Sequence, residues 1–141
     1  MDRDLRLTVR SDPKLLGSIR SLVRSWVDAW EMDEKTVDRV VLAIDEACTN
    51  AIRHAYEGRC DGTVELTLHA GEEYLEFQVS DTGLSCPSVC TERRPLEKPE
   101  VDDLRPGGLG IQLIHEVFDE VEFFPGESGG NCVTMKLERP K

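Results

Sequence analysis

Strict alternation of apolar and polar residues predicts five short strands in this chain. Residues 4–10 (DLRLTVR), 63–70 (TVELTLHA) and 74–80 (YLEFQVS) carry an apolar residue at every second position. Two further strands are expected at 120–124 (EVEFF) and 131–138 (NCVTMKLE). Successive side chains of a strand point to opposite faces, so each segment would have one apolar and one polar face. The pattern therefore predicts a sheet that is buried on one side.

Apolar residues at helical spacing predict three helices between these strands. The first follows the Asp-Pro pair at 12–13, which suits a helix start, and its apolar stripe continues to Trp30. The second starts near Asp33 and runs to about Tyr56, and the third follows the glycines of residues 107–119 (GGLGIQLIHEVFD). The element order predicts an α+β fold: a two-layer sandwich with a mixed, mostly antiparallel sheet and three helices on one face.

Residues 84–106 interrupt this regular pattern. They contain four prolines with charges between them and show neither helical nor strand periodicity. A long connection without secondary structure is uncommon inside a compact domain and is usually a lid or a binding loop. With 141 residues, the whole chain (1–141) is expected to form a single domain with one lid.

Composition narrows the classes of partner. The chain has 17 basic and 28 acidic residues and a net charge of −11, which argues against direct binding to nucleic acid or to an anionic membrane. No apolar run approaches ~18 residues and no leader-like segment is present, so a cytoplasmic protein is expected. Its five scattered cysteines suit reduced thiols in a core or loop better than a disulfide framework.

The segment DEACTNAIRHAY (45–56) is unusual for an amphipathic helix. Its apolar positions fall on one side, while Glu46, Asn50, Arg53 and His54 fall together on another. A solvated helix face would explain the charges, but it does not explain an asparagine in mid-helix. A carboxylate and an amide one turn apart could instead place a general base beside an oxygen that binds a metal ion.

Two further segments point to a nucleotide. Asp81 ends a hydrophobic strand, where its carboxylate could accept a hydrogen bond from an exocyclic amine such as that of adenine, and Gly83 would let a planar ligand approach the backbone. Residues 107–110 (GGLG) precede a helix, so their N–H groups could bind phosphates. Each signal is weak by itself, but their order around residues 84–106 is more specific.

These three segments resemble the conserved boxes of a known superfamily. DEACTNAIRHAY, DTG and GGLGIQLI look like the N box, the first glycine box and the second glycine box of the Bergerat-fold (GHKL) ATPases. The Glu-x-x-x-Asn pair and the short chain most resemble the anti-sigma-factor serine/threonine protein kinases of that superfamily. The resemblance covers nearly the whole chain and implies the Bergerat ATP-binding fold, with ATP or ADP and Mg²⁺ as ligands.

The resemblance also implies a role for each matched residue. Glu46 would be the general base that activates the hydroxyl receiving the γ-phosphate, and Asn50 would be the Mg²⁺ ligand. The other implied nucleotide contacts are Arg53 and His54 beside the nucleotide, Asp81 on the adenine amine, Gly83 under the ring, and Gly108, Leu109 and Gly110 along the phosphates. Two positions depart from the family pattern: Ser85 where many relatives have glycine, and Asn131 where they often have threonine.

Three functions are compatible with these boxes. The resemblance favours an ATP-dependent kinase acting as an anti-sigma regulatory factor: it would phosphorylate an anti-anti-sigma antagonist protein, sequester a sigma factor and form homodimers. The alternative is a non-catalytic switch module that binds nucleotide and a partner protein without transferring phosphate, and Glu46 argues against it. The catalytic half of a histidine kinase is disfavoured, because no room remains for a dimerising helix with a phosphoacceptor histidine.

Overall fold

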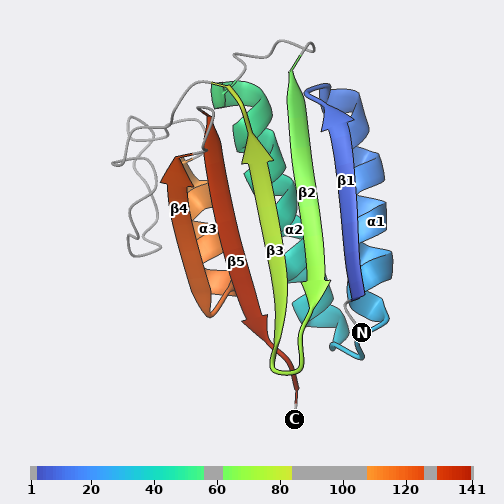
Figure 1. The fold of residues 1–141 in the computed structure, drawn as a ribbon. Helices are drawn as coiled ribbons and strands as arrows, with labels where there is room; N and C mark the ends of the chain where they lie inside the picture. Colours follow the sequence, from blue (N-terminus) through green and yellow to red (C-terminus); the bar gives the residue numbers. More distant parts are fainter. Residues whose placement is uncertain (1–2, 56–61, 84–107, 126–129, 141) are drawn as a thin grey trace.

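A five-stranded sheet forms one layer of the protein (Figure 1). The computed structural model describes residues 3–55, 62–83, 108–125 and 130–140. The strands lie in the order β1-β2-β3-β5-β4, and each of the four pairings is antiparallel. Their bounds are β1 (Arg3–Arg10), β2 (Thr63–Ala70), β3 (Tyr74–Asp81), β4 (Glu120–Pro125) and β5 (Asn131–Glu138).

Helices α1 (Leu16–Asp28), α2 (Glu34–Asn50) and α3 (Gly108–Val117) form the second layer and cover one face of the sheet (Figure 1). A 3₁₀ turn, η1 (Pro13–Leu15), precedes α1, and a π turn, η2 (Ala51–Ala55), follows α2. The two-layer α+β sandwich is therefore confirmed. The expected mixed sheet is not observed, because the described strands contain no parallel pair.

Local sequence explains where the helices begin. Asp12 accepts a hydrogen bond from the Lys14 N–H and is followed by Pro13, whose missing N–H is not needed in a first turn. Asp33 caps α2 by accepting a bond from the Thr36 N–H, 3.0 Å away. Both starts match the sequence prediction. The second helix was expected to continue as one helix to about Tyr56, but the α-helical hydrogen bonding ends at Asn50 and Tyr56 lies outside the described residues.

The core lies between the sheet and the helices. Burying one large aliphatic or aromatic side chain contributes roughly 1.5–3 kcal/mol, so this interface dominates the stability of the fold. Trp26 of α1 and Phe118 pack edge-on or tilted against Phe77, with ring centroids 5.7 and 5.5 Å from it. The largest completely buried side chains are Phe77, Ile19, Ile44, Leu66, Leu68, Leu75, Ile114 and Met135.

Two of the five cysteines fall in the described part of the chain, and both are buried free thiols. Burial raises the pKa of the Cys48 thiol to about 12. Burial also raises the pKa of Cys132. A thiol with a raised pKa stays protonated and is a poor nucleophile. Their packing agrees with the expectation of core cysteines; Cys60, Cys86 and Cys90 lie outside the described residues.

The outer face of the sheet is polar, as the alternation predicts. One row across the strands pairs Asp4, His69, Glu76, Lys136 and Glu120 in register. Asp4 forms an ion pair with His69, and the Lys136 ammonium lies 3.8 Å from Glu120. Such exposed pairs contribute little stability, typically under about 1 kcal/mol each. No described helix is both long and apolar enough to cross a bilayer.

Gly130 is constrained by the end of β3. Its φ of +85° lies in the left-handed region, which residues other than glycine rarely adopt. A Cβ at this position would lie 2.6 Å from Thr82 Cα and would also meet the backbone carbonyl of Asp81. Neither obstacle is a flexible side chain, so the backbone of one segment would have to move.

We expect Gly130→Ala to lower the free energy of unfolding by about 2–3 kcal/mol, because it adds both left-handed strain and a backbone contact. Urea denaturation measures the change. Gly17→Ala in α1 is the matched control: its Cβ would meet only Arg20 Nη2 at 3.5 Å, so stability should rise by up to about 1 kcal/mol. Equal changes in the free energy of unfolding for the two variants would contradict the steric constraint at Gly130.

Candidate functional site

The residues of the three boxes come together at one end of the sandwich. In Figure 1, α2 and β3 end there, while α3 and β5 begin there. These helix and strand ends belong to segments that are far apart in the sequence, and the antiparallel topology brings them to the same end of the sandwich. The predicted lid, residues 84–106, lies outside the described residues, as do Gly107 and Ser85.

Glu46 lies against the first turn of α3. Its half-buried side chain fills the space beside Gly110: a Cβ on this glycine would lie 3.0 Å from Glu46 Cδ and nearer still to Oε2. Gly108, Leu109 and Gly110 form this first turn, where N–H groups have no partner within the helix. The structure thus brings the predicted base to the predicted phosphate-binding turn.

The neighbouring acidic residue has a different environment. Asp45 forms a 2.9 Å ion pair with Arg20 of α1, so its carboxylate helps to hold α1 against α2. Arg24 and Asp38 form a second bridge between the same helices, at 2.8 Å. Of the adjacent carboxylates on α2, Glu46 is therefore the one directed towards α3.

Asn50 lies one turn beyond Glu46 and is half-buried at the end of α2. Its Oδ1 atom is buried and accepts no hydrogen bond from the described residues. A buried carbonyl oxygen without a donor is disfavoured by about 1–3 kcal/mol, so such atoms usually have another partner. A hard cation such as Mg²⁺ prefers oxygen ligands of this kind. Asn50 therefore fits the proposed role of metal ligand.

Two later residues of the first box, Arg53 and His54, lie in the π turn that follows α2. The π turn that follows Asn50 is wider than an α-helical turn, and such turns are frequent at functional sites. Within it, the Arg53 side chain is exposed. The backbone of His54 belongs to the same turn, but its side chain lies outside the described part of the protein.

Asp81 is a buried carboxylate at the end of β3, with 8% of its surface exposed. Its Oδ1 accepts hydrogen bonds from the Gly83 N–H at 3.0 Å and from Asn131 Nδ2 at 3.2 Å. Burial raises the pKa of Asp81, and these bonds oppose the rise by stabilising the charged form. These bonds tie the carboxylate to the turn after β3 and to the start of β5.

Sequence reasoning treated Asn131 as a departure from the family pattern and gave Gly130 no role, yet both residues contact the end of β3. Asn131 is the β5 partner of Asp81 in the β3–β5 register, which explains how its amide reaches the carboxylate. Gly130 permits the close approach of β5 to Asp81 and Thr82. The contact between Asp81 and Asn131 depends on the pairing of β3 with β5, and local sequence does not indicate which strands pair.

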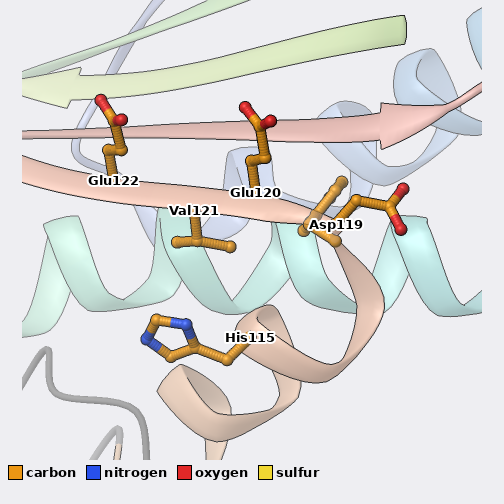
Figure 2. A pocket seen from close by; sticks show the side chains of 6 residues that line it. His115, Asp119, Glu120, Val121 and Glu122 are labelled. Atoms are coloured by element: carbon orange, nitrogen blue, oxygen red, sulfur yellow. The ribbon is translucent and has the colours of Figure 1, made fainter.

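A shallow hollow beside β4 is a separate feature (Figure 2). It has a volume of about 390 Å³ and lies at the C-terminal end of α3, away from the first turn that contains Gly110. Carboxylates on its wall would repel phosphates. Its lining residues are His115, Phe118, Asp119, Glu120, Val121 and Glu122.

Solved structures with the same architecture support this fold. The chain superposes on the structure of the RsbU and RsbW domains of Rv1364c from Mycobacterium tuberculosis with a TM-score of 0.65 and 19% identity, over 97% of its length. It spans 32% of that longer chain. The mycobacterial sensor histidine kinase MprB gives a TM-score of 0.56 at 15% identity, over 97% of this chain and 100% of that one.

Sequence relatives are closer. The serine-protein kinase RsbW of Halalkalibacterium halodurans is 31% identical over 96% of this chain and 84% of that protein. The anti-sigma F factor of Bacillus thuringiensis is 34% identical over 74% of this chain and 69% of that protein. Residues 9–137 match the family described as the histidine kinase-like ATPase domain. With its three boxes gathered at one edge of the sandwich, this chain belongs to the histidine kinase-like ATPase domain family.

Proposed function

We propose that this protein is an ATP-dependent serine/threonine protein kinase that acts as an anti-sigma factor. It would phosphorylate an anti-anti-sigma antagonist protein and sequester a sigma factor, in the cytoplasm and as a homodimer. The names of its relatives, serine-protein kinase RsbW and anti-sigma F factor, support this activity. The observation that carries the proposal is the position of Glu46 at the first turn of α3, with Asn50 one turn beyond it on α2.

In this proposal, Glu46 is the general base. Its carboxylate accepts the proton of the antagonist's serine or threonine hydroxyl while the hydroxyl oxygen attacks the γ-phosphorus of ATP. The bond between the γ-phosphorus and the β,γ-bridging oxygen breaks, and ADP leaves with that oxygen. The phosphoryl group ends on the antagonist, and the proton on Glu46 returns to solvent. A positioned base typically contributes 10²- to 10⁴-fold to such a transfer.

The phosphates would be held by two groups of this chain. The N–H groups of the first turn of α3, at Gly108, Leu109 and Gly110, can donate to phosphate oxygens at a helix N-terminus. Asn50 would hold Mg²⁺ through Oδ1, the buried oxygen that lacks a donor among the described residues. When bound, the ion would neutralise phosphate charge during transfer.

Adenine would be recognised at the end of β3. The Gly83 N–H and Asn131 Nδ2 both donate to Asp81 Oδ1, and the second carboxylate oxygen, Oδ2, is the proposed acceptor for the exocyclic amine. Gly83, two residues after Asp81, lacks a side chain that would obstruct the ring. The Asn131 amide keeps the carboxylate in place and takes the position where relatives often have threonine. Arg53 and His54 are proposed to act beside the nucleotide.

The kinase is tested by Glu46→Gln. We expect the single-turnover rate of phosphate transfer from ATP to a cognate antagonist to fall about 10²- to 10⁴-fold, because the amide cannot accept the proton. ATP affinity, measured by calorimetric titration, should stay within about threefold. Glu116→Gln removes an exposed carboxylate of α3 and should leave both quantities unchanged. Nucleotide binding by the wild type without any transfer would favour the non-catalytic switch instead.

The metal ligand is tested by Asn50→Ala. We expect Mg²⁺ to lose its effect on ATP affinity, because the oxygen that binds the ion is gone. The free energy of unfolding without nucleotide should not fall, and should rise by up to about 1–3 kcal/mol, since the variant removes a buried carbonyl oxygen without a donor among the described residues. Asn50→Asp keeps an oxygen at this position and should keep the Mg²⁺ dependence. An unaltered response to Mg²⁺ in the alanine variant would refute the role.

The adenine contact is tested by Asp81→Asn. The Nδ2 group of the asparagine amide cannot accept a hydrogen bond from the adenine amine, so ATP affinity should fall at least tenfold, about 1.4 kcal/mol.

The same variant tests the pH dependence of stability. Because burial raises the folded-state pKa of Asp81, the contribution of Asp81 to stability is present at low pH and is lost as pH rises through that pKa. The nucleotide-free asparagine variant should therefore gain stability relative to the wild type as pH rises. A difference in unfolding free energy between variant and wild type that stays constant from pH 4 to 8 would contradict this prediction.

A further inference from the structure

Gly110 and Glu46 share one small volume between α3 and α2. A methyl group on Gly110 would lie 3.0 Å from the carboxyl carbon of Glu46 and 3.2 Å from its Cβ, and would overlap Oε2. Real side chains essentially never approach within 3.0 Å, so either the carboxylate or a helix would have to move. Glu46 can therefore take its observed position only if residue 110 has no side chain.

The helices themselves have little freedom to separate. Gly110 and Ile111 at the start of α3 are buried, and Ala47 and Cys48, which follow Glu46 on α2, are buried as well. Moving α3 away from α2 would open this core, which is costly because packed interiors tolerate few voids. The Glu46 side chain, which has three rotatable bonds and is half-buried, is the part that would yield.

We propose that Gly110 is a positioning residue for the general base: the absence of a side chain there gives the Glu46 carboxylate its place at the first turn of α3. The inference rests on the proposed role of Glu46. It assigns to Gly110 a function in turnover, in addition to the backbone contact with phosphate that the family resemblance implies. In this proposal, the first turn of α3 positions both the base and the phosphates, so their distance from each other is set by one helical turn.

The two roles of Gly110 separate in kinetics. Displacing a catalytic group by about 1 Å can reduce a rate about 100-fold, so Gly110→Ala should lower the single-turnover rate by about that factor. Its ATP affinity, with Mg²⁺ present, should stay within threefold, because an alanine keeps the N–H group. A purely phosphate-binding role predicts the opposite result, weaker ATP binding with an unchanged rate at saturating ATP, and that result would overturn the proposal.

A double-mutant cycle tests the contact without any activity. Gly110→Ala should lower the urea midpoint in the wild type, and should lower it clearly less in a Glu46→Ala background, where the carboxyl group is absent and only the Cβ contact at 3.2 Å remains. Gly17→Ala, in the open first turn of α1, should raise the midpoint in both backgrounds. An equal drop at position 110 in both backgrounds would overturn the proposal.

Two further outcomes stay informative. If Gly110→Ala does not fold, recovery of a cooperative unfolding transition in the Glu46→Ala, Gly110→Ala double variant supports the steric contact, and failure to recover overturns it. If the wild type transfers no phosphate to any antagonist, the proposed kinase function fails. The stability cycle still decides whether residue 110 controls the place of the Glu46 side chain.

Discussion

The packing of α2 on the sheet determines where the chemistry can occur. Val40, Ile44 and Cys48 are completely shielded from solvent and fix the rotation of the helix about its axis. An α-helix turns 100° per residue, so this rotation also fixes the directions of every other side chain. Glu46 points to the first turn of α3 because the apolar residues point to the sheet, and Asn50 lies one helical turn further along α2. A shift of one residue in the apolar pattern would turn both away.

The site is built from groups that do not favour the folded state by themselves. Asp81 is a carboxylate in a buried position, and Asn50 Oδ1 is a buried oxygen without a donor among the described residues. A buried oxygen without a donor, such as Asn50 Oδ1, opposes folding by an amount comparable with what one buried apolar side chain contributes. The apolar interface of α1, α2 and the sheet supplies the compensation. Natural proteins commonly carry such locally unfavourable groups at the positions where ligands bind.

Local patterns in the sequence predicted the parts of the fold that depend on local physics. Alternation located each strand to within about one residue, and Asp12 and Asp33 marked two helix starts, since capping involves only neighbouring residues. Helical period also predicted that Glu46 and Asn50 share a side. Arg53 belongs to the π turn after Asn50, in which the angle between successive residues differs from that of an α-helix. No hydrophobic pattern encodes such a turn.

Contacts between distant segments were beyond the reach of the sequence. Asn131 meets Asp81 only because β5 pairs with β3 in one register, and Gly110 meets Glu46 only because α3 lies close to α2. The two contacts have different origins: strand pairing orients the proposed adenine acceptor, and helix packing orients the proposed base. Because these determinants are independent, substitutions in the β3–β5 pair should act on nucleotide affinity, and substitutions between α2 and α3 should act on turnover. The architecture thus gives binding and catalysis separate structural supports within a single small sandwich.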